Sequence, residues 1–390
     1  MKILFPIGTL YPSQQGGPSN TVYWMAKALT AQNVFVTLIA TLAGSEGKVK
    51  PNTWLSTNYG YVIYWAERLP QLPLRLIFTA YRQVSKHDVV HLNSLFYPPS
   101  FLLAAAAVWQ KKAVLWSCRG NLEEAALQYS RWKKRPILWF IRRFLTGQRV
   151  TFHATSPAEA AQTRNMFGPL SQVIEIPNFL ELPDLLPQSS NSEKPFILYM
   201  GRLHAIKALD NLLDALSLSK HFVATSYVIK IAGDTDNLYT RQLKRQVETL
   251  GLQNHVEFLG RVEGIEKQQL LADAYFLVLP SHSENFGNVV IESLAQGTPV
   301  IASKGTPWSM LETGKAGFWA DNAPDTLARA IDKALGLSPE EYREYRDNAL
   351  ALARQKFDIR ENVEVWIEAY QQAISGGTTQ ATTTATTLSN

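Results

Sequence analysis

The sequence is nearly free of cysteine, since Cys118 is the only one among 390 residues. A single cysteine excludes an internal disulfide, gives no support for a cysteine-based metal site, and fits the reducing cytoplasm where we expect the protein. The chain also lacks any run of about 18 uninterrupted apolar residues, so we predict no membrane span. Its first residues, MKILFPIGTLYP, have no charged n-region and no small-residue cleavage site, which predicts a first strand rather than a signal peptide.

Charged residues are scarce and unevenly distributed. They make up 18% of the chain, whereas hydrophobic residues make up 46%. A chain of 390 residues with this composition is long enough to form two or three domains, each with its own core. Residues 1–180 hold 19 Lys and Arg against 7 Asp and Glu, whereas residues 181–390 hold 19 against 26, which together give the net charge of +5. Halves of opposite charge predict two domains with different partners.

Short apolar runs alternate with amphipathic segments through the first half of the chain. This alternation predicts a parallel sheet with helices on both faces. A basic, aromatic helical stretch is expected over residues 122–145, with a break at Pro136. The other predicted elements are strands at 2–7, 34–40, 61–65, 88–92, 113–117, 150–154 and 173–176, and helices at 19–30, where Ser19 is the predicted cap, 72–85 and 99–110.

Periodicity stops in residues 181–195, a Pro-, Ser- and Asn-containing linker, and then restarts. Predicted strands follow at 196–200, 228–232, 256–258, 275–279 and 299–302, with helices at 208–218, 237–250, 264–272, 324–335, 339–356 and 359–374. We therefore expect an N-terminal domain over 1–180, a C-terminal domain over 196–358, a helix at 359–375 that packs back on the first domain, and a disordered Thr-rich tail over 376–390.

The stretch AYFLVLPSHSENFGNVVIESLAQGTPVIAS, residues 274–303, has the pattern of a strand, a helix and a second strand. Glu284 falls in the loop and Glu292 in the helix. Ligands bind at such strand ends in open α/β sheets, and free helix amides suit a phosphate or a hydroxyl. Two carboxylates there suit sugar hydroxyls, which donate well to an ionised acceptor. On spacing alone, two solvated surface charges explain the pair equally well.

A second candidate site opens the other half of this domain, in FILYMGRLHAIKALDNLLDAL. Gly201 ends a predicted strand, and Arg202 and Lys207 flank the start of the next helix. Two cations beside free helix amides suit a diphosphate. The alternative is that both are solvated surface charges.

Four motifs occur in one order: GRLHAIKALDNLLDAL, IAGDTD, HVEFLGRV and SENFGNVVIESLAQGTPVIAS. Together they resemble the C-terminal domain of the retaining glycosyltransferases of family 4, and GGPSNTVYWMAKAL resembles the glycine-rich loop and first helix of their N-terminal domain. The resemblance covers most of residues 1–375 and implies a GT-B fold, with two Rossmann-like doubly wound parallel-sheet domains facing a central cleft. One departure is Ala208, where the family usually has glycine. We expect the helix turn to tolerate alanine.

The resemblance implies a role for each matched position. Arg202 and Lys207 would bind the donor diphosphate, Glu284 the hydroxyls of the transferred sugar, and Glu292 the ribose hydroxyls. We treat Arg202, Lys207 and Glu284 as the catalytic set. The other implied donor contacts are Gly16 and Gly17 near the phosphates, Arg261 and Val262 near the base, and the amides of Asn285, Phe286 and Gly287.

The family also commonly places a histidine at the end of a strand in its N-terminal domain. Here that strand end reads Ser117-Cys118-Arg119-Gly120. Arg119 is a candidate for contact with the sugar, a phosphate or an acidic acceptor, with a surface arginine as the alternative. His91 is the second candidate, with a buried structural histidine as the alternative, and His153 is a weaker one.

The implied reaction is retaining transfer of a hexose from a nucleotide diphosphate sugar, with a UDP-hexose such as UDP-glucose as the first candidate. The acceptor would be a glycan or a lipid-linked sugar in exopolysaccharide synthesis. We find no convincing carboxylate nucleophile, so the resemblance favours same-face substitution, in which the departing phosphate helps to accept the acceptor's proton. Asp234-Thr235-Asp236 spells an Asp-x-Asp motif, but we interpret it as structural and predict no metal and no cofactor.

Two rival classes stay open: a GT-B enzyme that modifies its own sugar nucleotide, such as a 2-epimerase, and a non-catalytic glycan- or partner-binding subunit. The basic stretch suggests docking on anionic membrane at the inner face, with an ordinary solvated helix as the alternative. Nothing matches a nucleic-acid-binding motif. The cations of the basic stretch are Arg131, Lys133, Lys134, Arg135, Arg142, Arg143 and Arg149, and they are interleaved with Trp132, Trp139 and Phe140.

Overall fold

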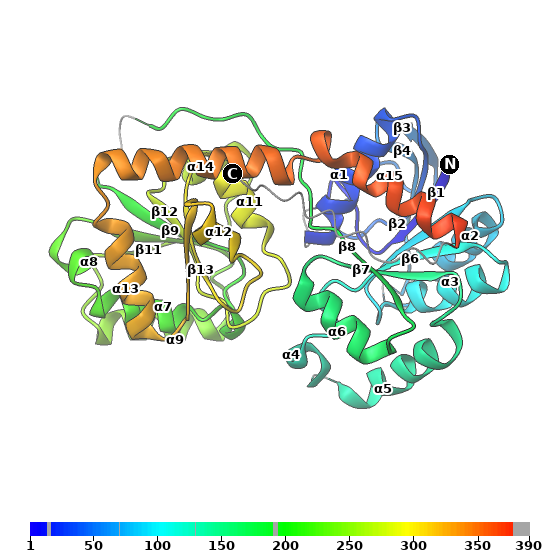
Figure 1. Ribbon diagram of the computed structural model, residues 1–390, viewed down its shortest axis with the longest axis horizontal. Coiled ribbons are helices and arrows are strands. Elements are labelled where there is room, and N and C mark those ends of the chain that lie inside the picture. Colours follow the sequence, from blue (N-terminus) through cyan, green and yellow to red (C-terminus); the bar gives the residue numbers. More distant parts are fainter. Residues whose placement is uncertain (14–16, 70, 129, 190–193, 377–390) are drawn as a thin grey trace. The chain divides into compact units, whose positions relative to one another are not determined.

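The computed structural model describes residues 1–13, 17–69, 71–128, 130–189 and 194–376. The chain divides into two compact units: unit 1 comprises residues 1–179 and 362–390, and unit 2 comprises residues 180–361. Each unit contains a sheet covered by helices on both faces (Figure 1). Gly16 and the tail beyond residue 376 lie outside the described residues, so the predictions made for them stay predictions.

The sheet of unit 1 has the strand order β3-β4-β2-β1-β5-β6-β7-β8 and is parallel except for the β3–β4 hairpin. The chain builds outward from β1 in one direction and then, from β5, in the other. The carboxyl ends of β1 and β5 therefore form a topological switch point, where open α/β sheets bind ligands. The strands are β1 Lys2–Ile7, β2 Phe35–Thr41, β3 Trp54–Thr57, β4 Gly60–Trp65, β5 Val89–Asn93, β6 Ala113–Ser117, β7 Val150–Ala154 and β8 Gln172–Glu175.

The helices of unit 1 cover both faces of this sheet (Figure 1). Buried residues of α2 Leu74–Val84 and α3 Pro98–Trp109 share one apolar core with alternate residues of β5 and β6. On the other face, Tyr370 of α15 Ile359–Ser375 contacts Met25 of α1 Gly17–Ala31. The remaining helices are α4 Glu124–Gln128, α5 Arg131–Phe140, the π-helical turn η1 Ile141–Leu145 and α6 Pro157–Phe167.

Two predicted helix boundaries in unit 1 are wrong. The basic stretch is not broken at Pro136, which lies inside α5; α4 ends at Gln128, and Ser130 adopts a left-handed φ of 54° immediately before α5. Ser19 does not begin α1, because the helix starts at Gly17 and the Ser19 hydroxyl donates to the carbonyl of Thr9 instead.

The sheet of unit 2 is parallel throughout, with the order β11-β10-β9-β12-β13-β14, and its switch point lies between β9 and β12. Buried residues of α7, α9 and α13 pack on one face, and α11 lies with α14 on the other (Figure 1). The strands are β9 Phe196–Met200, β10 Val228–Ala232, β11 Val256–Gly260, β12 Phe276–Leu279, β13 Val300–Ser303 and β14 Gly317–Ala320. The helices are α7 Leu209–Leu218, α8 Lys220–Ala224, α9 Leu238–Thr249, α10 Gly264–Asp273, α11 Asn288–Ala295, α12 Met310–Thr313, α13 Pro324–Leu335 and α14 Pro339–Phe357, preceded by the 3-10 turn η2 Ala205–Lys207.

Among the described residues, none of the helices is both long enough and apolar enough to cross a membrane.

Candidate functional site

Lys207 and Glu284 meet at the switch point of unit 2. Lys207 ends η2 in the loop after β9, and Glu284 lies in the loop between β12 and α11. The Lys207 ammonium donates to Glu284 Oε2, and the two side chains are 12% and 19% exposed. Two predicted site residues that are 77 positions apart in sequence therefore form one half-buried ion pair at a strand edge suited to ligand binding.

The loop that carries Glu284 is held in place by backbone contacts on both sides. Its Glu284 amide donates to the carbonyl of Gly305 at 3.0 Å, and the His282 amide donates to Ile206 of η2 at 2.9 Å. Gly305 must be glycine, because a Cβ there would lie 2.3 Å from the carbonyl oxygen of His282. The fold thus fixes the Glu284 carboxylate relative to the Lys207 turn.

Helix α11 begins where the sequence predicted amide contacts. Gly287 precedes its first residue with a left-handed φ of 83°, and a Cβ there would crowd the Glu284 side chain. Phe286 is buried against Trp308, whose indole N–H donates to the Phe286 carbonyl at 2.5 Å. Asn285 precedes this pair in the same loop.

Glu292, on α11, has a partner that the sequence analysis missed. Lys267 of α10 donates to Glu292 Oε1 at 2.7 Å, and the side chains are 29% and 19% exposed. No motif marks Lys267, because the pairing depends on how α10 packs beside α11. Both predicted site carboxylates of unit 2, Glu284 and Glu292, therefore face a lysine.

The remaining predicted residues of unit 2 lie on loops at the same carboxyl edge of the sheet. Arg202 follows β9, is exposed, and its carbonyl accepts from the Tyr199 hydroxyl at 2.9 Å. Arg261 and Val262 follow β11, and Arg261 is an exposed side chain that pairs with Glu263. Arg261 and Val262 follow the edge strand of the sheet, and neither arginine forms a hydrogen bond with Lys207 among the described residues.

Ala208 adopts a left-handed backbone, with φ of 50° and ψ of 42°, at the start of α7. Glycine adopts this conformation without the steric cost that a Cβ brings. The chain accommodates alanine here with its methyl group fully buried.

The Asp-x-Asp sequence makes local structure in unit 2. The Asp236 amide donates to Asp234 Oδ1 at 3.1 Å, and Asn237 caps α9 by accepting from Thr240. Within the part of the chain that the structure describes, no three His, Cys, Asp or Glu residues are grouped to hold a metal ion.

Two family models match the chain in succession. The model for Glycosyltransferase Family 4 matches residues 15–182, and the model for Glycosyl transferases group 1 matches residues 186–351. The chain belongs to glycosyltransferase family 4. The second match covers Lys207, Glu284 and Glu292, so the paired residues lie inside the segment that carries the family pattern.

Individual relatives of this family 4 chain are distant. It is 35% identical over 166 residues to the D-rhamnosyltransferase WbpZ of Pseudomonas aeruginosa, which is 42% of this chain and 41% of that protein. It is 24% identical over 300 residues to the GDP-mannose:cellobiosyl-diphosphopolyprenol alpha-mannosyltransferase of Komagataeibacter xylinus, which is 75% of this chain and 73% of that one. The chain thus spans about two fifths of the length of the first of these relatives.

Solved structures show the fold. A sucrose-phosphate synthase from Thermosynechococcus elongatus has a TM-score of 0.71 at 20% identity, covering 97% of this chain and 100% of that one. HepE from Anabaena, in complex with UDP-glucose, has a TM-score of 0.70 at 22% identity, covering 95% and 100%. The family 4 chain has the GT-B fold that the sequence predicted, with two Rossmann-like parallel-sheet domains.

In unit 1 of this family 4 chain, Arg119 is drawn inward rather than solvated. Its Nε donates to Asn93 Oδ1 at 3.2 Å and its Nη1 to Asn178 Oδ1 at 2.7 Å. No helix starts at this residue, since α4 begins at Glu124. Burial lowers the pKa of Arg119 because the charged form loses hydration. The geometry does not support the surface-arginine alternative. Gly17, the second of the two glycines predicted to contact the donor phosphates, is the exposed first residue of α1.

His91 is fully buried and both of its ring nitrogens are bonded. Its Nδ1 lies 2.6 Å from the Tyr370 hydroxyl and its Nε2 lies 2.8 Å from Ser117 Oγ. Ser117 Oγ lies 2.7 Å from His153 Nδ1, and His153 Nε2 lies 2.8 Å from the carbonyl of Ile176. We call these four side chains the polar ladder; it crosses β5, β6 and β7 and reaches α15.

The last acceptor fixes the direction of the polar ladder. A carbonyl only accepts, so His153 donates from Nε2 and accepts at Nδ1 from Ser117. Ser117 then accepts from His91 Nε2, and Tyr370 donates to His91 Nδ1. Every ring nitrogen is satisfied with both histidines neutral, which favours the structural interpretation of His91. Its contact with a sugar stays a prediction.

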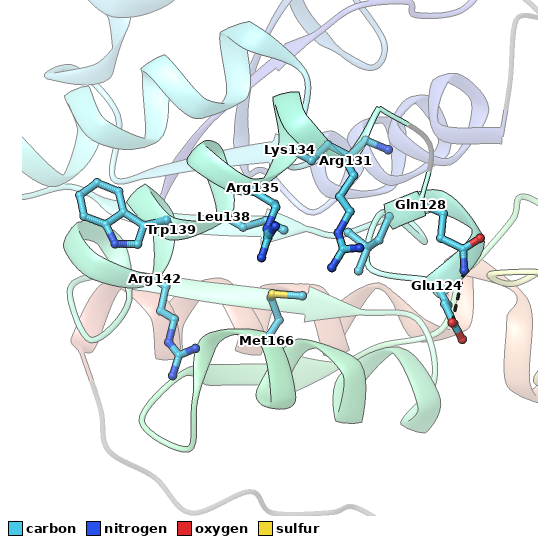
Figure 2. A pocket seen from close by; sticks show the side chains of 10 residues that line it. Glu124, Gln128, Arg131, Lys134, Arg135, Leu138, Trp139, Arg142 and Met166 are labelled. Carbon is cyan, nitrogen blue, oxygen red and sulfur yellow. Dashed lines mark hydrogen bonds between the residues drawn. The ribbon is translucent and has the colours of Figure 1, made fainter.

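The basic stretch of unit 1 lines a groove of about 560 Å³ between α5 and α6. Figure 2 shows Arg131, Arg135 and Arg142 on one side of it and Met166 facing them from α6. We call this the basic groove. Its residues are Glu124, Leu127, Gln128, Arg131, Lys134, Arg135, Leu138, Trp139, Arg142 and Met166.

Large apolar side chains of the same stretch face solvent. Trp132 is 88% exposed and Trp139 is 63% exposed, whereas Leu138 is buried. The three arginines of the groove make no ion pair among the described residues, and its only carboxylate, Glu124, accepts from Gln128 at 3.3 Å (Figure 2). Exposed cations and indoles are compatible with membrane docking and with an ordinary solvated helix, so docking stays a prediction.

Proposed function

We propose that this family 4 chain transfers a hexose from a nucleotide diphosphate sugar to a hydroxyl of a glycan or a lipid-linked acceptor, with retention of the anomeric configuration. The observation that carries this proposal is the Lys207–Glu284 pair at the switch point of unit 2. Lys207 can bind a phosphate and Glu284 can accept hydrogen bonds from sugar hydroxyls. The two lie together at the edge where parallel sheets bind ligands.

Each charged group has a separate task in the proposed reaction. Lys207, Arg202 and the first amides of α11 stabilise the diphosphate as negative charge develops on it. Glu284 accepts hydroxyls of the sugar that moves, and Glu292 accepts the two vicinal hydroxyls of the ribose. Because protein cations supply the positive charge, we propose a metal-independent reaction that needs no cofactor.

We propose retention through the same-face route that the family resemblance favours, and the engagement of both carboxylates supports a route without an enzyme nucleophile. Glu284 faces Lys207 and Glu292 faces Lys267, so neither is assigned as a nucleophile. In same-face substitution the bond from the anomeric carbon to the phosphate oxygen breaks, and the acceptor oxygen bonds to that carbon from the same side. The acceptor's proton passes to the departing phosphate, which leaves as the nucleoside diphosphate.

A UDP-hexose, with UDP-glucose first, is the proposed donor. It draws support from the complexes of Anabaena HepE with UDP, glucose and UDP-glucose, although that protein shares only 22% identity with this chain. The relative from Komagataeibacter xylinus is named for GDP-mannose and for a cellobiosyl-diphosphopolyprenol acceptor. A lipid-linked acceptor in exopolysaccharide assembly at the inner face of the membrane is consistent with that second name.

A thermal-shift panel of UDP-, GDP- and ADP-sugars tests the donor, because a ligand raises the melting temperature by stabilising only the state that binds it. We expect UDP-glucose to give the largest rise. A larger rise with a GDP- or ADP-sugar would replace the proposed base, and no rise with any donor would favour a non-catalytic binding subunit. Incubation of the donor alone separates the other rival, since a 2-epimerase converts it without an acceptor.

The basic groove and the exposed Trp132 and Trp139 of the same stretch fit docking on an anionic membrane surface, where a lipid-linked acceptor would be held. Each juxtamembrane Lys or Arg contributes about 1 kcal/mol near such a surface at moderate salt. Replacing Arg131, Arg135 and Arg142 together by glutamine should therefore abolish co-sedimentation with phosphatidylserine vesicles at low salt. The matched control removes three exposed cations of α9 in unit 2, Arg241, Lys244 and Arg245, and should still co-sediment. Equal loss in both triple variants would contradict docking through the groove.

A further inference from the structure

Two buried nitrogen atoms at the switch point of unit 1 have no hydrogen-bond partner among the described residues: Nδ2 of Asn93 and Nη2 of Arg119. Asn93 ends β5 and is only 6% exposed, and Arg119 follows β6. Buried donors are satisfied in the great majority of cases, so two orphans on adjacent strand ends mark a place where a ligand or an ordered water completes the bonding.

Charge favours an anionic ligand over water. Arg119 donates to two neutral amide oxygens, those of Asn93 and Asn178. The negative charge of Glu159 favours the charged form of Arg119, but the Glu159 carboxylate accepts from the Gly120 amide at 2.6 Å and the Thr155 amide at 2.7 Å and forms no ion pair with the guanidinium among the described residues. A guanidinium drawn into the protein without a carboxylate partner is costly, and an incoming anion would remove that cost.

The backbone at both strand ends is held in an unfavourable conformation. Ser94 has φ of 65° and Arg119 has φ of 57°, both in the left-handed region that non-glycine residues seldom adopt. Asn121 secures the Ser94 turn, because its Oδ1 accepts from the Ser94 hydroxyl at 2.7 Å and from the Leu95 amide at 2.6 Å. Strained backbone of this kind is concentrated at functional sites, where it gives a side chain an orientation that an unstrained backbone would not allow.

A third polar atom lies close to the same switch point. The Tyr97 hydroxyl is also buried without a partner, and it lies 3.3 Å from where a Cβ of Gly8 would be. Gly8 directly follows β1, the neighbour of β5 in the sheet. The orphaned atoms therefore come from the end of β5, from the loop that follows β5 and from the loop after β6, and the Tyr97 hydroxyl lies beside the residue that follows β1.

We infer that Asn93 and Arg119 bind an oxyanion, a carboxylate or a phosphate, that the sugar acceptor carries. A guanidinium and a carboxamide N–H₂ together offer donors on two sides of such a group, and Arg matches its planar geometry best. This inference rests on the proposed function, in which unit 2 already supplies the cations for the donor diphosphate. It narrows the acceptor to an acidic sugar or a sugar phosphate.

Asn93→Asp gives a sharp test, because the new carboxylate is isosteric and lies beside the Arg119 guanidinium. It should pair with Arg119 and thus raise the melting temperature by about 2 °C or more. It should also repel an anion. We therefore expect D-glucuronate and inorganic phosphate, each at millimolar concentration, to raise the melting temperature of the wild-type protein but not of this variant. D-glucose is the neutral control and should raise neither.

Arg119→Gln keeps the result interpretable if Asn93→Asp folds poorly. It removes the guanidinium, so the response to both anions should disappear with little change in the melting temperature without anion. The inference is overturned if neither anion stabilises the wild-type protein, if the response survives in both variants, or if both variants are strongly destabilised as for a purely structural arginine.

UDP distinguishes the two possible sources of the anion and separates this inference from the proposed function. We expect the rise in melting temperature with UDP to survive in Asn93→Asp. Its loss there would assign the oxyanion to the donor and overturn the acceptor assignment. Absence of any UDP response in the wild-type protein would instead count against the proposed function, while a glucuronate response lost in Asn93→Asp would still support the anion site.

Discussion

At the switch point of unit 2, between β9 and β12, each site lysine lies against a carboxylate: Lys207 against Glu284, and Lys267 on the adjoining α10 against Glu292. Among the described residues at the switch point of unit 1, between β1 and β5, Arg119 donates to the amide oxygens of Asn93 and Asn178, and Asn93 Nδ2 has no hydrogen-bond partner. The same sheet topology thus carries lysines balanced by ion-paired carboxylates in one unit. In the other it carries an arginine that forms no ion pair among the described residues, although the charge of Glu159 acts on it.

The difference indicates what each unit is built to receive. A donor has an anionic diphosphate and neutral hydroxyls, so a site for it needs both cations and carboxylates, and these can neutralise each other in pairs. A site with donors only suits a group that is purely an acceptor, such as a carboxylate. The overall charges agree, since residues 1–180 are basic and residues 181–390 are acidic.

The largest effect is expected from Lys207→Ala. The variant loses the cation that stabilises the departing diphosphate and leaves Glu284 without its partner. By analogy with removal of one oxyanion donor, kcat/KM should fall by roughly 10²–10³, or about 3–4 kcal/mol of transition-state stabilisation. Steady-state kinetics with UDP-glucose and acceptor measure this. Lys304→Ala, which breaks an exposed ion pair with Asp321 in the same unit, is the control and should retain activity.

Wild-type turnover by Lys207→Ala would remove the catalytic assignment of the Lys207–Glu284 pair. It would also weaken the contrast between the two switch points, because the balanced charge of unit 2 would then be only structural.

Acidification should affect unit 1 more than unit 2. Burial lowers the pKa of His91 well below its usual value and that of His153 to about 3, and the nearby Arg119 charge acts in the same direction. The unfolded chain titrates near 6.5, so between about pH 6.5 and 3 it binds protons that the folded polar ladder cannot. The stabilisation is complete above pH 6.5 and is lost below it, by about 2 kcal/mol per histidine at pH 5.

Hydrogen exchange resolved by peptide checks this expectation. After correction for intrinsic rates, β5, β6 and β7 should lose protection between about pH 7.5 and pH 5, whereas β9 and β12 should lose less. Equal losses in the two sheets would mean that the polar ladder does not control the acid sensitivity of unit 1.

Lys207 and Glu284 of unit 2 could be predicted from the sequence because each lies in a loop that follows a predicted strand. Buried apolar runs predicted β9 and β10 at their observed bounds, and Lys207 and Glu284 fall in the loops that such strands must have. Lys267 was missed because its partner, 25 residues away, is set by helix packing. Strands β3 and β14 were not predicted.

The acceptor side was less readable, for a different physical reason. Arg119 was a candidate only because the family histidine is absent, and nothing in the sequence marks Asn93. These two residues stand out because one buried nitrogen atom of each has no hydrogen-bond partner among the described residues. The lack of a partner can be recognised only when the positions of the surrounding atoms are known. His91 was open between two interpretations until the Tyr370 hydroxyl, 279 residues later in the chain, was found on its ring.

Lys267→Ala should give the smallest effect and a different kinetic signature. Lys267 contacts Glu292, the proposed ribose ligand, and not the groups assigned to the reacting sugar or phosphate. It is therefore a positioning residue, and its loss should weaken the ground state and the transition state alike. For a partly exposed pair worth about 1 kcal/mol, KM for the donor should rise roughly fivefold with kcat unchanged. Lys267→Gln, which can still donate to Glu292, should restore part of the affinity. If kcat fell as much as it does in Lys207→Ala, the two ion pairs would not have separate tasks. The Lys207–Glu284 and Lys267–Glu292 pairs would then both act on the reacting groups during the reaction.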